Sequence, residues 1–508
     1  MEYHLTKKSI RGTRRALDTC AEQAADIDLT LPDYCPDIER ILSCTLDPQI
    51  YMNSVSGDRL NVEGASCVRV LYLDSERGCL RAYETSQPFS ESFPLKGDVT
   101  DCAVSVQAKP EYINCRALSP RKLSLHGAFS LCARVTVPCE IESFSYEDGG
   151  DLQTKSETLS VSSLCGICSE SFSVQEDLPV SAESGSGTIL GRRVSARMTE
   201  VRAIRGKIML SAEIRLEMML PRGAEQTEAE CMSFAVPVSR VIDCEGVTED
   251  AVIDGELNVL SADVRLSDDS PDDSRLLLTD VKLCFSALCW EEQQLDVLCD
   301  AFSTDREVQL KQEPFSCRGG MVCRSFTDVG KAAVSVEEDI GRVIDVRCEK
   351  LTSSVVQNED AVTVYTKLCA GILSENTDGE KRYAQRDAEF RYTPDTGEND
   401  EVVRLKSSLD SLSYRLTDAR HIELRAELAY HMTLCRRQSC TALTAVTADD
   451  DAPERVRDDA LILYYPDSGE QVWDIAKRFC SRPADIIDEN NLSGDCADSG
   501  MMLLIPRA

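Results

Sequence analysis

Residues 461–506 read LILYYPDSGEQVWDIAKRFCSRPADIIDENNLSGDCADSGMMLLIP. The first apolar run, Leu461 to Tyr465, ends at Pro466, which cannot donate a hydrogen bond to a strand ladder. A helix is predicted next, because apolar residues recur at helical spacing; they are Val472, Trp473, Ile475, Ala476 and Phe479. Pro483 suits the first turn of a second helix, and Met502 to Ile505 form a second apolar run. The segment therefore predicts a strand–helix–helix–strand module.

This order of elements resembles the LysM module along its full length. Residues 469–473, Gly-Glu-Gln-Val-Trp, match the turn before the first LysM helix. Residues 490–492, Asn-Asn-Leu, match the turn after the second helix, and residues 504–506, Leu-Ile-Pro, match the final strand. Gln471 stands where LysM modules usually have threonine. The resemblance implies one of two ligands, since most LysM modules bind N-acetylglucosamine-containing glycans and some bind proteins.

Two loops of this module form the candidate contact surface, because loops held on a rigid scaffold often carry binding residues. LysM modules bind between the first strand–helix turn and the loop before the last strand. The candidate partner- or glycan-binding residues in or beside these loops are Asp467, Ser468, Gly469, Glu470, Asn491, Leu492, Asp495 and Asp498. Trp473 is instead expected in the core, because its helical neighbours are apolar and so small a module has little else to bury.

Composition favours a protein ligand over a glycan. The chain has 508 residues, a formal net charge of −33 and an apolar fraction of 42 %. An acidic surface argues against nucleic-acid binding, because phosphate backbones attract basic surfaces. The N-terminal sequence lacks the apolar run of a signal peptide, and no stretch approaches the about 18 apolar residues of a membrane span. We therefore expect a cytoplasmic protein without a membrane span, whereas many glycan-binding LysM proteins are exported.

No pattern of catalytic or metal-ligating residues stands out in the sequence. The four histidines are scattered, whereas a nucleophile or a metal centre needs a converging set. The single C-x-x-C, Cys165 to Cys168, lacks a second pair at the spacing of a zinc site. We expect no enzyme activity, no cofactor and no bound metal. We also expect the 24 cysteines to be free thiols that behave as small apolar residues in a cytosolic chain.

The rest of the chain contains an internal repeat, seen as two markers that each occur three times in the same order. The first marker begins at residues 60, 208 and 362, and the second at residues 123, 276 and 422. Each copy consists of short alternating strands bounded by turn residues, which is typical of a β-sandwich or an open barrel. The sequence thus predicts a mostly β chain with these parts: an N-terminal arm at 1–26, three tandem β domains at 27–140, 165–295 and 300–437, a charged linker at 448–460 and the βααβ LysM-like module at 461–508.

The start of the first copy carries a further motif. Pro32-Asp33 and Pro36-Asp37-Ile38, followed by the run from Leu60 to Gly64, resemble the start of the SPOCS domain of endospore-forming bacteria. With the terminal module, the threefold repeat resembles the SipL-like family of spore-coat morphogenetic proteins. The resemblance implies a non-enzymatic scaffold of the mother cell, at the forespore surface, that binds the coat's basement-layer morphogenetic ATPase and other coat proteins. The alternative is a carbohydrate-binding protein that recognises peptidoglycan.

Overall fold

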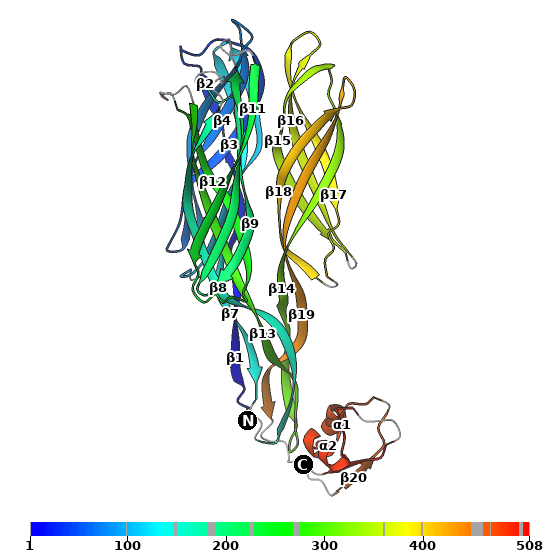
Figure 1. The fold of residues 1–508 in the computed structure, drawn as a ribbon. Coiled ribbons are helices and arrows are strands. Elements are labelled where there is room, and N and C mark those ends of the chain that lie inside the picture. Colours follow the sequence, from blue (N-terminus) through cyan, green and yellow to red (C-terminus); the bar gives the residue numbers. More distant parts are fainter. Residues whose placement is uncertain are drawn as a thin grey trace.

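The computed structural model describes residues 2–97, 99–146, 150–180, 188–222, 228–267, 275–358, 361–397, 400–448, 461–467, 469–496 and 501–506. Most of these residues lie in strands, so the predicted mostly β fold is confirmed. The strands before residue 449 form three units with the same plan (Figure 1). In each unit the first strand pairs with the last, the last also pairs with the strand before it, and three intervening strands form a second sheet.

All strand pairs within the units are antiparallel. Unit 1 consists of β1 (Thr6–Ala24), β2 (Ile27–Thr30), β3 (Ile38–Ser56), β4 (Arg59–Asp74), β5 (Leu80–Pro94), β6 (Ala103–Ser119) and β7 (Lys122–Ser145). Unit 2 consists of β8 (Leu152–Val180), β9 (Gly191–Ile204), β10 (Lys207–Arg222), β11 (Glu228–Asp243), β12 (Val252–Leu266) and β13 (Arg275–Ser303). Unit 3 consists of β14 (Val308–Ser335), β15 (Ile340–Gln357), β16 (Val362–Asn376), β17 (Lys381–Tyr392), β18 (Asp400–Leu416) and β19 (His421–Ala448).

The two sheets of each unit bury apolar side chains between them. In β10 alternate residues such as Ile208, Leu210 and Leu216 are buried, and they share one core with Leu283 and Phe285 of β13 in the other sheet. A strand presents every second side chain to the same face, so alternation in the sequence becomes one apolar face. Burying a side chain of this size stabilises the fold by about 1.5–3 kcal/mol. Each unit is therefore held by the packing of sheet on sheet.

The unit boundaries differ from the ranges expected from the sequence. Residues 6–24, expected within an N-terminal arm, form β1 and pair along their length with β7. The first strand of unit 2 begins at Leu152, and the last strand of unit 3 continues to Ala448. In β1, which is long and partly exposed, the charged residues of TKKSIRGTRR hide the period-two pattern that marks a half-buried strand.

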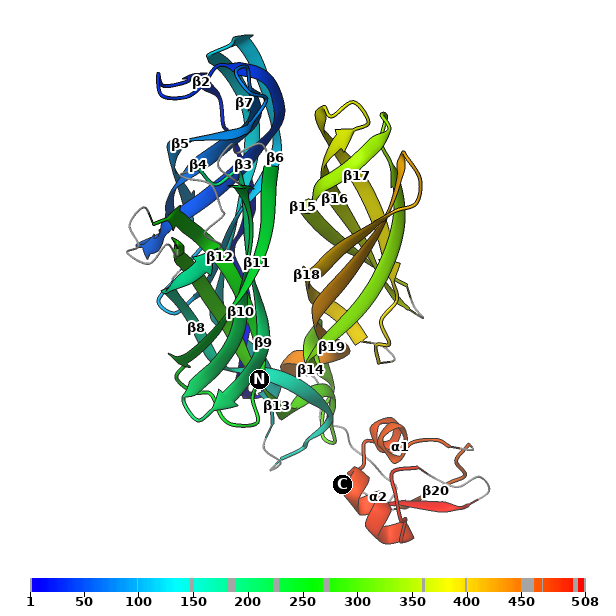
Figure 2. The ribbon, with the colours of Figure 1, turned by 45° about the horizontal axis from the view of Figure 1, so that its top comes forward.

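The first and last strands of the three units extend beyond the sandwiches and form a common stalk (Figure 1). Its three ribbons are β1–β7, β8–β13 and β14–β19. Near the tip, Tyr3 of unit 1, Leu152 of unit 2 and Leu443 of unit 3 are buried in one apolar cluster. Figure 2 shows the sandwich of unit 3 beside those of the other two units. The three units are thus joined side by side around a shared stalk.

A buried polar cluster joins the three units above the stalk, where β6, β12 and β18 meet. Gln107 Nε2 donates a hydrogen bond to Asn258 Oδ1 over 2.6 Å, and Lys406 Nζ donates to the same oxygen over 2.9 Å. Arg404 forms an ion pair with the buried Asp254. Burial lowers the pKa of Lys406 to about 8. Because unpaired buried charge is costly, this cluster requires the three units to keep one arrangement.

One cysteine pair contradicts the expectation that all cysteines are free. Cys20 on β1 and Cys132 on β7 are direct partners in the strand register and form a disulfide. Side chains opposite each other in an antiparallel pair have Cβ atoms about 4.5–5.5 Å apart, which brings two thiols within bonding reach. The two residues are 112 positions apart, so their spacing in the sequence did not predict the bond.

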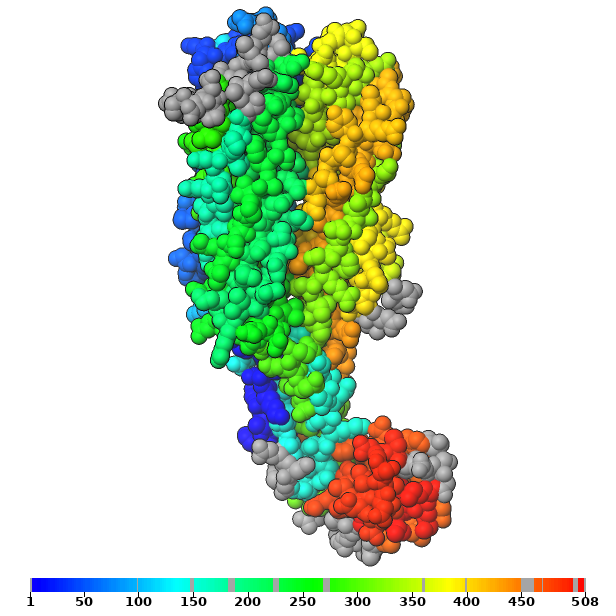
Figure 3. Space-filling view, in the orientation of Figure 1, coloured from blue at the N-terminus to red at the C-terminus, as the bar shows by residue number. Residues whose placement is uncertain are grey.

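The predicted linker at 448–460 lies outside the described residues, apart from Ala448 at the end of β19. Beyond it, the C-terminal module lies against the tip of the stalk (Figure 3). Neither helix in the described part of the chain has the length and apolar character that a membrane crossing requires.

Candidate binding site on the C-terminal module

The C-terminal module has the order of elements predicted for it. It consists of β20 (Leu461–Tyr464), α1 (Val472–Phe479), α2 (Pro483–Asn490) and β21 (Leu503–Pro506). The two strands pair antiparallel, and the helices pack on one side of them. Val472, Ile475, Ile486, Leu503 and Ile505 form its core, with at most 1 % of each side chain exposed. The apolar positions that predicted the helices are the ones that hold the module together.

The two loops chosen as the candidate contact surface meet in space. The Val472 N–H at the start of α1 donates to the Asp495 carbonyl over 2.8 Å, and Gln471 forms an isolated β-bridge with Cys496. Gly469 in the first loop has φ of 80°, a left-handed conformation that glycine adopts without steric cost. Asp467, Gly469 and Asp495 are exposed at this junction. Of the eight candidate residues, Ser468 and Asp498 lie outside the described residues.

The carboxylate of Glu470 makes its contacts within the module. Its carboxylate accepts hydrogen bonds from the Tyr464 hydroxyl over 2.9 Å and from the Asp467 N–H over 3.1 Å. It also pairs with the Arg478 guanidinium over 3.1 Å, and only 12 % of its side chain is exposed. The hydrogen bond to Glu470 raises the pKa of Tyr464. These contacts tie the first loop to α1 and leave little of the carboxylate for a ligand.

The Asn-Asn-Leu turn is also largely structural. Asn490 accepts from the Leu504 N–H over 2.7 Å and donates to the Leu504 carbonyl over 2.7 Å, which joins α2 to β21. Asn491 ends the helix in the left-handed conformation, with φ of 51°. Leu492 donates its N–H to the Ile487 carbonyl and packs on the core. The exposed side chain of Asn491 is the part of this turn that can reach a ligand.

Trp473 lies at a contact between the module and unit 2 rather than wholly within the module core. Its indole N–H donates to Asp300 over 2.9 Å, and its ring lies edge-on to Phe302 with 5.0 Å between centroids. Lys477, one helical turn further along α1, donates to the same Asp300 carboxylate over 2.7 Å. Both stalk residues belong to β13. The face of α1 that carries Trp473 is therefore covered by the stalk.

An exposed apolar surface on the module was missed by reasoning from the sequence. Leu463 is 58 % exposed and Tyr465 is 67 % exposed. Leu461 and Met502 are 49 % and 45 % exposed. Residues 461 and 463 alternate along β20, so they lie on the side of the sheet opposite to the helices, while Tyr465 directly follows β20 and Met502 directly precedes β21. We call these four residues the outer sheet face. The run Leu461 to Tyr465 is apolar throughout, so its sequence does not show which of its side chains are exposed.

The groups considered for catalysis lie apart from this module. His126 faces Asp26 in unit 1, whereas His421 and His431 lie in unit 3 beside Asp418 and Ser325. The C-x-x-C of unit 2 has neighbours that its sequence did not show, because Cys244 and Cys289 approach Cys168 in the fold. The Sγ atoms of Cys244 and Cys289 are 4.0 Å apart. This thiol group is buried in the core of unit 2.

Comparison with known families identifies one part of the chain. Residues 37–118 match the family model described as SipL, SPOCS domain. The matched range covers β3, β4, β5 and most of β6 of unit 1. The chain is thus SipL-like in this part, and a role related to sporulation follows from the match. No curated protein and no solved structure matches the chain.

Proposed function

We propose that this protein is a non-enzymatic scaffold of spore-coat assembly whose C-terminal module is a protein-binding LysM module. In this proposal the module binds the basement-layer morphogenetic ATPase of the coat. The three β units contact further coat proteins, and the protein acts in the mother cell at the forespore surface. The family match at residues 37–118 supports the link to sporulation, and the resemblance of residues 461–506 to LysM supports the binding mode.

The observation that carries the choice of ligand is the outer sheet face. A glycan is recognised by polar groups and aromatic stacking, whereas a protein partner buries an apolar patch of aliphatic and aromatic residues. Leu463 and Tyr465 are such residues, and most of each side chain is exposed. Fewer polar side chains remain to bind a glycan than the sequence suggests, because Glu470 is engaged within the module.

The test is affinity capture from sporulating cells with the full-length chain as bait. We expect the wild-type chain to retain the coat ATPase. The double variant Leu463→Arg/Tyr465→Ser should lose it, because a buried arginine without a partner is costly at an apolar interface. Val241→Arg is the matched control, since Val241 is 54 % exposed on β11 of unit 2. Sedimentation with purified peptidoglycan is measured on the same proteins.

Two results would contradict the proposal. One is equal retention of the ATPase by the wild type and the double variant. The other is cosedimentation with peptidoglycan that depends on the exposed loop residues Asp467 and Asn491, with no protein captured. The second result would support the carbohydrate-binding alternative, because these residues lie in or beside the loops where LysM modules hold glycans.

A further inference from the structure

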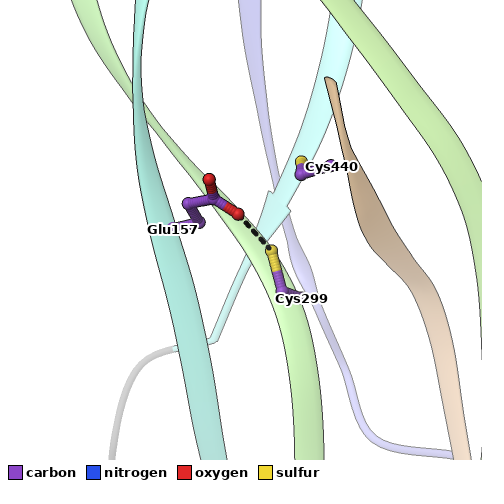
Figure 4. A group of neighbouring side chains, drawn as sticks. All are labelled: Glu157, Cys299 and Cys440. Atoms are coloured by element: carbon purple, nitrogen blue, oxygen red, sulfur yellow. Dashed lines mark hydrogen bonds between the residues drawn. The ribbon is translucent and has the colours of Figure 1, made fainter. Parts of the chain in front are cut away.

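The stalk contains a group of two thiols and one carboxylate where unit 2 meets unit 3 (Figure 4). Glu157 lies on β8, Cys299 on β13 and Cys440 on β19. One carboxylate oxygen and the two Sγ atoms all lie within 4.8 Å of one another. We propose that these three side chains bind a borderline-soft divalent cation of the zinc class and thereby fasten unit 2 to unit 3.

The backbone of β13 is irregular at this place. Leu298 pairs with Ser156 and Asp300 pairs with Lys155, so Cys299 is an extra residue that has no partner on β8. A bulge of this kind bends the strand and redirects its side chain. Figure 4 shows Cys299 and Glu157 pointing toward each other, with Cys299 Sγ 4.0 Å from Glu157 Oε2. A regular ladder would have placed Cys299 in ordinary alternation with its neighbours.

The donor set fits zinc in both chemistry and size. Zinc binds thiolate sulfur at about 2.3 Å and carboxylate oxygen at about 2.0–2.2 Å in a tetrahedral arrangement. Two sulfurs on one such ion are about 3.8 Å apart, so donor atoms within 4.8 Å of one another need to move inward by only about 1 Å. Two thiolates select zinc over the hard cations magnesium and calcium, which prefer oxygen. Three protein ligands leave the fourth position for water.

The surroundings admit a cation from solvent and favour its retention. Glu157 is exposed, while Cys299 and Cys440 are partly buried against an apolar cluster that includes Val297 and Phe315. A bound divalent cation would supply the positive charge that lets both sulfurs bind as thiolates, with release of their protons to solvent.

A second cysteine group in the described chain could also take up the metal, so the experiment must distinguish it from the group at Glu157. Cys168, Cys244 and Cys289 lie together in the core of unit 2, with 4.0 Å between the sulfurs of the last two. These three residues are all thiols, and each is at most 9 % exposed. The group at Glu157 differs in joining two units, because its ligands come from strands that pack together only in the assembled stalk.

The experiment uses the full-length chain, purified with reductant and stripped of metal. Cobalt(II) is titrated as a spectroscopic probe and then displaced with zinc. We expect one equivalent of tetrahedral cobalt with a sulfur-to-cobalt charge-transfer band. Cys299→Ser and Cys440→Ser should abolish the band, and Glu157→Gln should weaken binding by about tenfold or more. Glu313→Gln, an exposed carboxylate on β14, and Cys231→Ser, an exposed thiol, should bind like the wild type.

Three results would overturn the proposal. Cobalt uptake could be absent in the wild type although circular dichroism shows a folded chain. It could persist in the Cys299→Ser/Cys440→Ser variant and disappear in Cys244→Ser, which would assign it to the core of unit 2. Finally, protein whose thiols are blocked during lysis could contain a Cys299–Cys440 disulfide that forms equally in Glu157→Gln, and the pair would then be a disulfide rather than a cation site.

Discussion

Trp473 of the C-terminal module and Asp300 of unit 2 are joined by a hydrogen bond of 2.9 Å from the indole N–H to the carboxylate. Asp300 directly follows the bulge at Cys299, and it also accepts a hydrogen bond from Lys477. This relationship fixes which face of the module is covered. The face of α1 that bears Trp473 is turned to the stalk, while the outer sheet face remains open to a partner.

Removing the Asp300 carboxylate should release the module from the stalk tip. We expect Asp300→Ala to weaken docking by about 1 kcal/mol, because it removes two hydrogen bonds from partly exposed donors. Trp473 is one of only two tryptophans, so its greater exposure should shift the fluorescence of the chain to longer wavelength. Asp296→Asn, on the same strand but bonded to Thr158, should leave the spectrum unchanged. An unshifted spectrum for Asp300→Ala would mean that the module does not depend on this contact.

Removing Arg404 should destabilise the junction of the three units. Its guanidinium pairs with Asp254 and Glu256, whose side chains are only 7 % and 10 % exposed. Loss of one partner leaves buried charge without compensation, which costs about 3–5 kcal/mol. Arg404→Ala should therefore lower the midpoint of urea unfolding, whereas Arg415→Ala, exposed on the same strand, should not. Equal midpoints for the two variants would contradict the role given to the junction.

The buried carboxylate of Asp74 should make unit 1 sensitive to acid. Burial raises its pKa, but hydrogen bonds from the Arg77 N–H over 2.8 Å and from Arg81 over 3.0 Å outweigh that effect, so its pKa is lowered from 3.8. A carboxyl with a lowered pKa in the folded state stabilises the fold above its ordinary pKa, and this stability is lost as the pH falls through the folded value.

The test compares the wild type with Asp74→Asn in urea unfolding at several pH values. We expect the variant to be less stable by about 1–3 kcal/mol at neutral pH, and the difference should shrink as the pH falls below about 4. Glu76→Gln changes an exposed carboxyl in the same turn and should behave like the wild type throughout. A difference that stays constant down to acid pH would show that the charge of Asp74 is not the cause.

Replacing Cys132 should destabilise unit 1 only under conditions in which the wild type forms the Cys20–Cys132 disulfide. The bond closes a long loop, since the residues are 112 positions apart, and removing such a crosslink typically costs about 2–5 kcal/mol. Cys132→Ser should unfold at lower urea than the wild type without reductant, and the two should converge when reductant is added. Cys496→Ser, an exposed thiol in the module, serves as the control. No change on reduction of the wild type would mean that the crosslink does not stabilise unit 1.

Much of the candidate site could be predicted from the sequence. The parts that could not be predicted can be traced to particular residues. The spacing of Val472, Ile475 and Ile486 defined both helices of the module, and the loops around them meet as the LysM resemblance implied. The sequence did not separate ligand-facing side chains from structural ones. Glu470 looks like a free polar group in a loop, yet it is tied to Tyr464 and Arg478. Whether the candidate residues bind a ligand stays a prediction.

The sequence by itself determined the local features: alternating strands, a repeat that occurs three times and the strand–helix–helix–strand order of the last segment. The strands and the module follow from periodicities and turn residues that act within a few positions of one another, and the repeat follows from the recurrence of such patterns along the chain. Only the tertiary structure decided the common stalk, the Cys20–Cys132 bond, the group at Glu157, Cys299 and Cys440, and the docking of Trp473 on Asp300. Each of these joins residues more than 100 positions apart. Such contacts depend on strand register and on a single-residue bulge, and a shift of one residue turns a side chain to the opposite face of its sheet.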